Sequence, residues 1–370
     1  MSLRLETTLA GYGRAAVDLK TRMWEVSQTS TARSYLKILA EDVFEHVLGN
    51  DPRNDPRSSS AEDGRLLNSL VGMTSAAWRV GEPYVLAPAM TAVVAAAADA
   101  LDLTGERLPG DIAPTAHGVL FLPQPVYHRL PSGAVTGIGA ITWARLTTTR
   151  GRPAWAVFGW SDRDDPHSPA AADVRARLAG HPQLASQLGP YLLTDFDLIP
   201  IGEPLDPVPQ RPATNTSTVD PTAIQSASDE QDRDWQPASD GLYCIDHSTT
   251  APHTPVLTAL AYAFWRIQAQ PLAATARPPL DRAATRRAAR ASVVHGTRIV
   301  MLRRLHATDP DISATGEARW HYTVRFVVRG HWRHLRDRDG NPYRIWINAH
   351  IKGPDGAPLL GGEKVAILAR

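Results

Sequence analysis

A predicted β-hairpin near the C-terminus constrains the fold of this chain more than any other feature. Asp339-Gly340 is a strong signal for a two-residue turn, because both residues tolerate the positive backbone angles of a type I′ turn. With this pair as the loop, Arg338 lies opposite Asn341. Alternate positions on both arms then carry the apolar residues that we expect to face the core, namely Trp320, Tyr322, Val324, Phe326 and Val328, and Tyr343, Ile345, Ile347, Ala349 and Ile351.

The opposite face of this predicted hairpin is basic. The turn register pairs Arg333 with Trp346, His331 with Asn348, and Arg329 with His350. Arginine presents a planar fork to phosphate or carboxylate, tryptophan offers a stacking plane, and asparagine can read a base edge. We therefore expect a ligand-binding face made of Arg325, Arg329, His331, Arg333, Arg344, Trp346, Asn348, His350 and Lys352.

The charge of the chain is distributed very unevenly. The formal net charge is only +1 over 370 residues. The stretch 271–370 nevertheless holds sixteen Arg, two Lys and eight acids, a net of +10, so the preceding 270 residues carry −9. A helix predicted at Leu280–Ser292 adds Arg282, Arg286 and Arg290 on one face, because residues four apart are neighbours on a helix. This asymmetry favours a polyanion partner, either DNA or RNA.

The pattern along the chain predicts an α+β protein with two regions. Residues 1–203 read as an acidic α+β region, with N-terminal helices and a mostly antiparallel sheet. Residues 204–240 are rich in Pro, Ser, Thr and Asp, which predicts a disordered linker. Residues 241–370 read as a basic α+β domain, with helices packed on an antiparallel sheet.

Several classes of protein are disfavoured. A single cysteine, Cys244, excludes an intrachain disulfide framework, and the apolar run Met90–Ala98 is too short to cross a bilayer. The N-terminus lacks the apolar core of a signal peptide, so we expect a cytoplasmic protein without membrane contact. Asp162, Asp164 and Asp165 fit a solvated turn with a helix cap better than a metal site, and we expect neither metal nor cofactor.

Two further functions stay open at this point, and the sequence does not fix the oligomeric state. His331 and His350 are diagonal neighbours in the predicted hairpin and could act as acid and base in an enzyme for a nucleotide or phosphorylated substrate. Alternatively, the basic domain is an interaction module that docks on an acidic partner protein or on its own acidic linker, which contains Trp235.

Four C-terminal segments together resemble a known signature. They are RRAARASVV, RIVMLRRL, VRGHWRHLRD and YRIWINAHIKGPDGAPLL. Their order is similar to the C-terminal signature of an uncharacterised family found in plasmid, phage and genome-island neighbourhoods of high-GC Gram-positive bacteria, over about the last 90 residues. The resemblance implies a mobile genetic element and supplies no activity. We therefore expect a nucleic-acid-binding or regulatory protein of such an element, with attention drawn to His331, Trp332, Arg333, Trp346, His350, Lys352 and Gly353.

Overall fold

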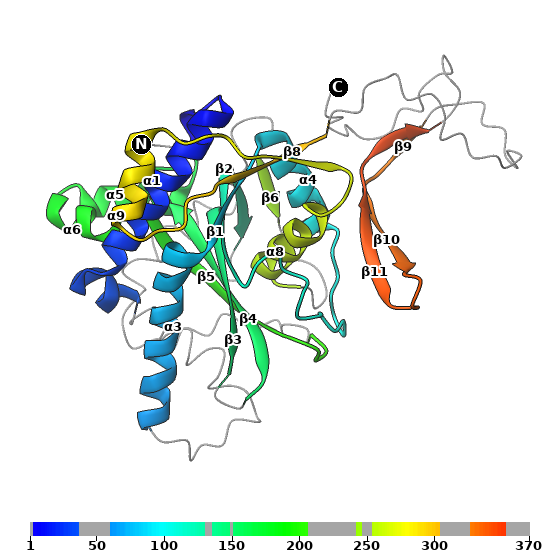
Figure 1. Ribbon diagram of the computed structural model, residues 1–370, viewed down its shortest axis with the longest axis horizontal. Helices are drawn as coiled ribbons and strands as arrows, with labels where there is room; N and C mark the ends of the chain where they lie inside the picture. Colours follow the sequence, from blue (N-terminus) through cyan, green and yellow to red (C-terminus); the bar gives the residue numbers. More distant parts are fainter. Residues whose placement is uncertain are drawn as a thin grey trace, which may run out of the picture.

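The computed structural model of the chain describes residues 3–36, 60–129, 135–148, 151–205, 242–245, 254–303 and 326–352. An eight-stranded sheet lies at its centre, with helices on both faces (Figure 1). The expected α+β class is confirmed. The strands, in chain order, are β1 (Glu82–Leu86), β2 (His117–Arg129), β3 (Val135–Thr147), β4 (Pro153–Asp162), β5 (Tyr191–Pro200), β6 (Tyr243–Ile245), β7 (Ala273–Ala276), β8 (Arg298–Leu302), β9 (Phe326–Val328), β10 (His331–Arg336), β11 (Pro342–Ile347) and β12 (His350–Lys352).

The sheet is mixed rather than antiparallel throughout. Its order is β5-β4-β3-β2-β1-β8-β7, and β6 pairs with β2 away from this path. The run from β2 to β5 is antiparallel, whereas β1 lies parallel to both β2 and β8. The helices are η1 (Leu3–Leu5), α1 (Leu9–Ser27), α3 (Ser60–Val80), α4 (Pro88–Asp99), α5 (Pro169–Leu178), α6 (Pro182–Leu188), α8 (Val256–Ile267) and α9 (Arg282–Arg290).

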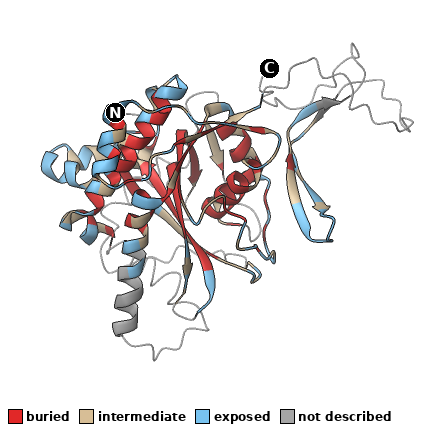
Figure 2. Ribbon diagram, viewed as in Figure 1, coloured by how far each residue is buried: buried red, intermediate tan, exposed pale blue. Residues whose placement is uncertain are grey.

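Alternation along the strands gives the sheet a hydrophobic core on each face. Tyr84 and Leu120 belong to one core, whereas their neighbours Val85 and Phe121 belong to the other. The first core includes α4 and α8, and the second includes α1 and the end of α3. Figure 2 shows the central strands and α8 as largely buried. The fold is therefore a three-layer arrangement, with the sheet between two helical layers.

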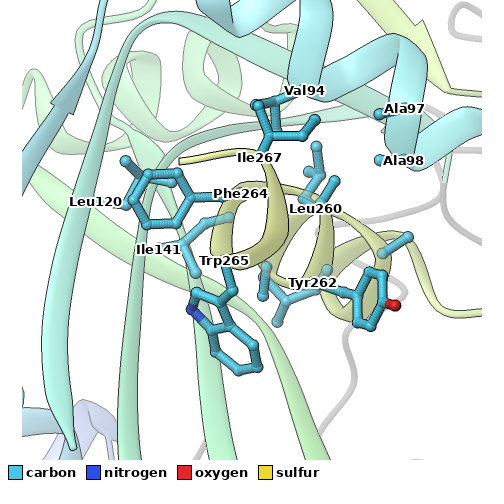
Figure 3. Close-up of a cluster of buried hydrophobic side chains, with 14 of the residues drawn as sticks. Val94, Ala97, Ala98, Leu120, Ile141, Leu260, Tyr262, Phe264, Trp265 and Ile267 are labelled. Carbon is cyan, nitrogen blue, oxygen red and sulfur yellow. The ribbon is translucent and has the colours of Figure 1, made fainter. Parts of the chain in front are cut away.

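Helix α8 is buried on nearly every side. Figure 3 shows Phe264 near Leu120 and Ile141 of the sheet, while Ile267 lies near Val94 of α4. The N-cap residue of this helix is Pro255, whose side chain cannot form a capping hydrogen bond. The carboxylate of Asp197 on β5 supplies that cap instead, accepting hydrogen bonds from Thr258 N at 3.0 Å and Thr258 Oγ1 at 2.8 Å. A buried strand carboxylate therefore fixes the start of the central helix.

Residues on both sides of the predicted linker build the same sheet. β6 pairs with β2, and β8 pairs with β1, so strands from 241–370 continue a sheet begun within 1–203. The predicted linker itself falls mostly outside the described residues. The expected division at 204–240 therefore does not coincide with a division of the central sheet.

The C-terminal hairpin forms, but its predicted register is wrong by one residue. Trp332, not Arg333, lies opposite Trp346. The loop has three residues, 338–340, closed by a bond from Asp337 N to Asn341 O at 2.9 Å. The Asp337 carboxylate accepts hydrogen bonds from the amides of Asp339 and Asn341, and Gly340 has a φ of 84°. These are the features of a three-residue loop with a left-handed final glycine. Because side chains alternate along a strand, one extra loop residue changes which side chains of the two arms share a face.

Candidate nucleic-acid interface

Helix α9 forms because its sequence combines a strong cap with strong helix formers. The Asp281 carboxylate accepts a hydrogen bond from Ala284 N at 2.7 Å, and this bond holds the pKa of Asp281 below its usual value. The helix itself contains only Arg, Ala and Thr. Ala284 and Ala288 are buried on its inner side. Because the buried residues are alanines, the helix packs closely against the rest of the protein, and its arginines lie on the exposed side.

Three of the arginines of α9 form a row along the helix. Arg282, Arg286 and Arg290 are exposed and lie four residues apart, so they follow one another along a single helix face. In the part of the chain that the structure describes, no carboxylate lies within salt-bridge distance of these three side chains. Arg287, in contrast, forms a 2.6 Å ion pair with Asp18 of α1. The three arginines that were predicted to share one face of a helix therefore do so, and their side chains are exposed.

The hairpin turns its predicted ligand residue Trp346 inward. Trp346 is 5% exposed, and its ring meets the ring of Trp332 edge-on at 5.5 Å. Trp332 in turn contacts Tyr262 of α8 and donates from Nε1 to the carbonyl of Ala97 at 2.8 Å. That carbonyl lies in the last turn of α4, where helix carbonyls lack partners within the helix. The expectation that the Trp346 ring faces outward and stacks on a ligand is therefore wrong. The ring is buried and helps to anchor the hairpin to α4 and α8.

Arg344 and Asn348 also serve the anchor. The Arg344 guanidinium forms an ion pair with Glu106 and donates to the carbonyl of Asp102 at 3.0 Å. Asn348 Oδ1 accepts a hydrogen bond from Trp346 Nε1 at 2.8 Å. Both side chains therefore help to hold the hairpin in place. Arg344 lies near Trp346 because its guanidinium bonds to the protein, and it does not face solvent.

The remaining hairpin candidates lie in different surroundings. His331 and Arg333 are exposed on the outer face of β10, and Arg329 is exposed just before that strand. His350 is exposed on β12. Arg325 lies outside the described residues, as does the side chain of Lys352.

His331 and His350 do not form the expected diagonal pair. His331 lies opposite Ile347, whereas His350 lies opposite Val328, three ladder positions away. Each imidazole Nδ1 contacts the carbonyl two residues before it, at 3.1 Å. The register that would have placed the two rings together is the one that the three-residue loop removes.

The helix and the hairpin are on different parts of the molecule. Figure 1 shows α9 beside α1 at one end, while β10 and β11 extend from the other end, next to α8 and α4. The predicted site residues therefore form two surfaces. One is the α9 row, made of Arg282, Arg286 and Arg290. The other is the outer hairpin surface, where His331 and Arg333 share a face with Leu335, Tyr343, Ile345 and Ile347. The last three were expected to face the core, and the change of register places them outside.

The structure also contains a buried ionic network that sequence reasoning missed. His128 Nε2 lies 3.2 Å from Asp195 Oδ1, an ion contact too poorly aligned to be a good hydrogen bond. Burial opposes protonation of His128, but the carboxylates of Asp195 and Asp197 outweigh it, and the pKa of His128 is raised. Burial raises the pKa of Asp197 to about 6. The residues of this network come from β2 and β5, which are far apart in sequence, so no local motif could have indicated the network.

The acidic loop after β4 is a turn, as expected, but one of its carboxylates is buried. Asp165 is 1% exposed and accepts a hydrogen bond from Tyr127 OH at 2.8 Å. Arg4 forms ion pairs with Asp165 at 2.6 Å and with Asp162 at 3.2 Å. One guanidinium therefore offsets part of the negative charge of these two carboxylates. Among the described residues, no cluster of three or more His, Cys, Asp or Glu has an arrangement that would hold a metal ion.

Comparison with known proteins adds little to this geometry. No family model matches the chain, and no curated protein matches it. Among solved structures, the chain is similar to the crystal structure of AcrVA2, with 10% sequence identity and a TM-score of 0.33, over 89% of this chain and 97% of that chain. This score is too low to establish a common fold. None of the described helices is long and apolar enough to span a membrane.

Proposed function

We propose that the protein binds nucleic acid through phosphate contacts made by the α9 row. The observation that carries this proposal is the row of three exposed guanidinium groups on one helix, none of which forms an ion pair with a carboxylate of the described residues. A solvated surface ordinarily intersperses charges of both signs. Of the described acids beside α9, Asp18 pairs with Arg287 and Asp281 caps the helix, so neither forms an ion pair with the row.

The spacing of the row suits a chain of phosphates. Four residues of helix rise by about 6 Å, so Arg282 and Arg290 lie about 12 Å apart along the axis. The fork geometry of arginine allows two parallel hydrogen bonds to one phosphate. We assign all three guanidinium groups to phosphates, and the row carries no Asn or Gln amide beside them, so we expect binding that depends on the backbone and shows little sequence preference. A regulatory role in a mobile genetic element remains the expectation from the C-terminal signature.

The salt dependence of binding tests this proposal. A fluorescently labelled 20-base-pair duplex is titrated with the full chain at several salt concentrations. Removing one arginine that neutralises a phosphate should reduce the slope of log affinity against log salt by about 0.9 for duplex DNA. Arg286→Gln should therefore reduce the slope by about one, and the triple variant Arg282→Gln, Arg286→Gln, Arg290→Gln by nearly three.

A matched control uses an exposed arginine elsewhere. Arg152 pairs with Glu203 at 2.9 Å in a surface loop, so Arg152→Gln removes the same charge away from α9. This control should leave the slope unchanged. Affinity that is insensitive to salt, or a triple variant that binds like the original protein, would disprove the proposal.

A further inference from the structure

One edge of the hairpin is covered by α8 and the residues after it. In an antiparallel pair, successive residues point their backbone groups alternately toward the partner strand and away from it. On β11, Trp346 N donates to Gln270 Oε1 at 3.2 Å, and Arg344 O accepts from Arg266 Nη2 at 3.3 Å. These groups of β11 therefore point away from β10, toward α8.

The other edge belongs to β10 and is unpaired. Because Arg344 and Trp346 point away from the ladder, their opposite residues, His334 and Trp332, also point away from it, and so does Arg336. Within the residues that the structure describes, the backbone N–H and C=O groups of these three β10 residues have no hydrogen-bond partner. Such an edge is a template for another strand, and proteins ordinarily block it.

Each face of the strand carries an arginine and a histidine beside this edge. His331 and Arg333 are exposed on the outer face, and His334 and Arg336 are exposed on the other. β10 and β11 contain no acidic residue. A strand added to this edge would thus meet basic neighbours whichever way its side chains point, and cross-strand neighbours of opposite charge stabilise such pairing.

The outer face of the hairpin adds an apolar row. Tyr343 is 37% exposed, and Leu335, Ile345 and Ile347 are half-buried on the same face. Figure 2 shows much of this hairpin as exposed or intermediate, in contrast to the central sheet. Apolar side chains next to arginine and tyrosine are typical of the centre of protein interfaces.

We propose that β10 binds an extended acidic segment of a separate protein by strand addition. The unpaired backbone groups of Trp332, His334 and Arg336 would continue the ladder, and carboxylates of the added strand would lie beside Arg333 and Arg336. Apolar side chains of the added strand would contact Leu335. The amide ladder and the apolar row favour a polypeptide over a nucleic acid, which has no matching ladder of donors and acceptors. This surface is distinct from the α9 row.

Peptide binding to the full chain tests the proposal. The probe is a fluorescent, acetylated decapeptide in which pairs of Asp residues alternate with pairs of Val residues, so that each face of the added strand carries both kinds of side chain. The controls are the same peptide with Lys in place of Asp, and a single-stranded oligothymidine. We expect the Asp peptide to bind and the Lys peptide to bind at least about tenfold more weakly. The triple substitution in the α9 row should leave peptide binding unchanged, which separates this proposal from the nucleic-acid proposal.

Two substitutions at one position separate backbone pairing from charge. His334→Pro removes an amide that points away from β11, so the hairpin ladder itself is retained. It should weaken peptide binding by at least about tenfold, whereas His334→Thr keeps the amide and should change binding by less than about twofold. Arg333→Glu should weaken the Asp peptide and strengthen the Lys peptide. Far-UV circular dichroism checks that each variant is folded.

Each alternative outcome would overturn the proposal. Equal binding by His334→Pro and the original chain would exclude strand addition. Oligothymidine binding at the hairpin, abolished by Arg333→Glu and without any binding of the Asp peptide, would identify a nucleic-acid surface instead. A variant lacking residues 206–240 that gains Asp-peptide binding absent from the full chain would identify the chain's own acidic segment as the occupant, in place of a separate protein.

Discussion

At the scale of single residues, Lys20 is the most unusual group in the structure. Its side chain is fully buried in α1, and Nζ donates to the carbonyls of Arg79 at 3.0 Å and Val294 at 2.8 Å. Burial lowers the pKa of Lys20 to about 7. The amine therefore joins α1 to the end of α3 and to the segment after α9, and it does so through backbone carbonyls.

The lowered pKa of Lys20 makes the stability of the fold depend on pH. Between pH 7 and about 10 the unfolded chain holds a proton on this amine that the folded chain lacks, so the free energy of unfolding should rise with pH. The rise is at most about 1.4 kcal/mol per pH unit. Lys20→Met should remove it, giving a flatter profile in urea unfolding from pH 7 to 9.5. A difference between the two proteins that does not change with pH would contradict this prediction.

His128 should show the opposite pH dependence. Its pKa is raised in the folded chain, so the stabilising charge on the imidazole is present below its unfolded pKa and is lost as pH rises through the folded value. His128→Gln leaves Asp195 without its cationic partner and should cost about 3 kcal/mol at pH 6. The cost should be clearly smaller at pH 9. Urea unfolding at both pH values measures it, and an equal cost at both would show that the imidazole is neutral in the fold.

At the scale of elements, the anchor of the hairpin depends on a glycine. A Cβ atom at Gly330 would lie 2.4 Å from Trp346 Cζ2, so no larger residue fits while the ring keeps its position. Gly330→Ala should displace Trp346 and destabilise the anchored hairpin by about 1–3 kcal/mol. Hydrogen exchange at the amides of β10 and β11 should accelerate while the central sheet stays protected. Gly296→Ala, where a Cβ meets no atom within 4 Å, is the matched control.

The elements also show what a sequence can and cannot predict here. Arginines spaced four apart predicted the exposed face of α9, because this pattern depends on local geometry. The hairpin was predicted, but not its register. Two- and three-residue loops both end at Gly340, and the choice depends on hydrogen bonds of the Asp337 side chain. Because the loop is one residue longer than predicted, Trp346 lies on the buried face of the hairpin and anchors it, and it does not contact a ligand as predicted.

At the scale of the whole molecule, the division predicted from charge does not follow the sheet. The basic part of the chain supplies β7 and β8, which continue the sheet next to β1, and α8, which fills one of its two cores. Charge reports on surfaces, whereas pairing between β1 and β8 joins residues more than two hundred positions apart. Separation of charge along a sequence therefore indicates where basic side chains gather, and it does not predict which strands pair.

This shared sheet predicts that the two parts of the chain fold only together. We expect residues 1–205 and 242–370, produced in the same cells as separate polypeptides, to co-purify at a one-to-one ratio. Neither part alone should give a cooperative unfolding transition. Without its partner, each part would expose apolar residues that the intact chain buries, such as those of β1 in the first part and those of α8 in the second. The intact chain should give one transition when followed by tryptophan fluorescence and by circular dichroism. Trp78 and Trp265 report on opposite faces of the sheet, so two separate transitions would show that the halves are independent after all.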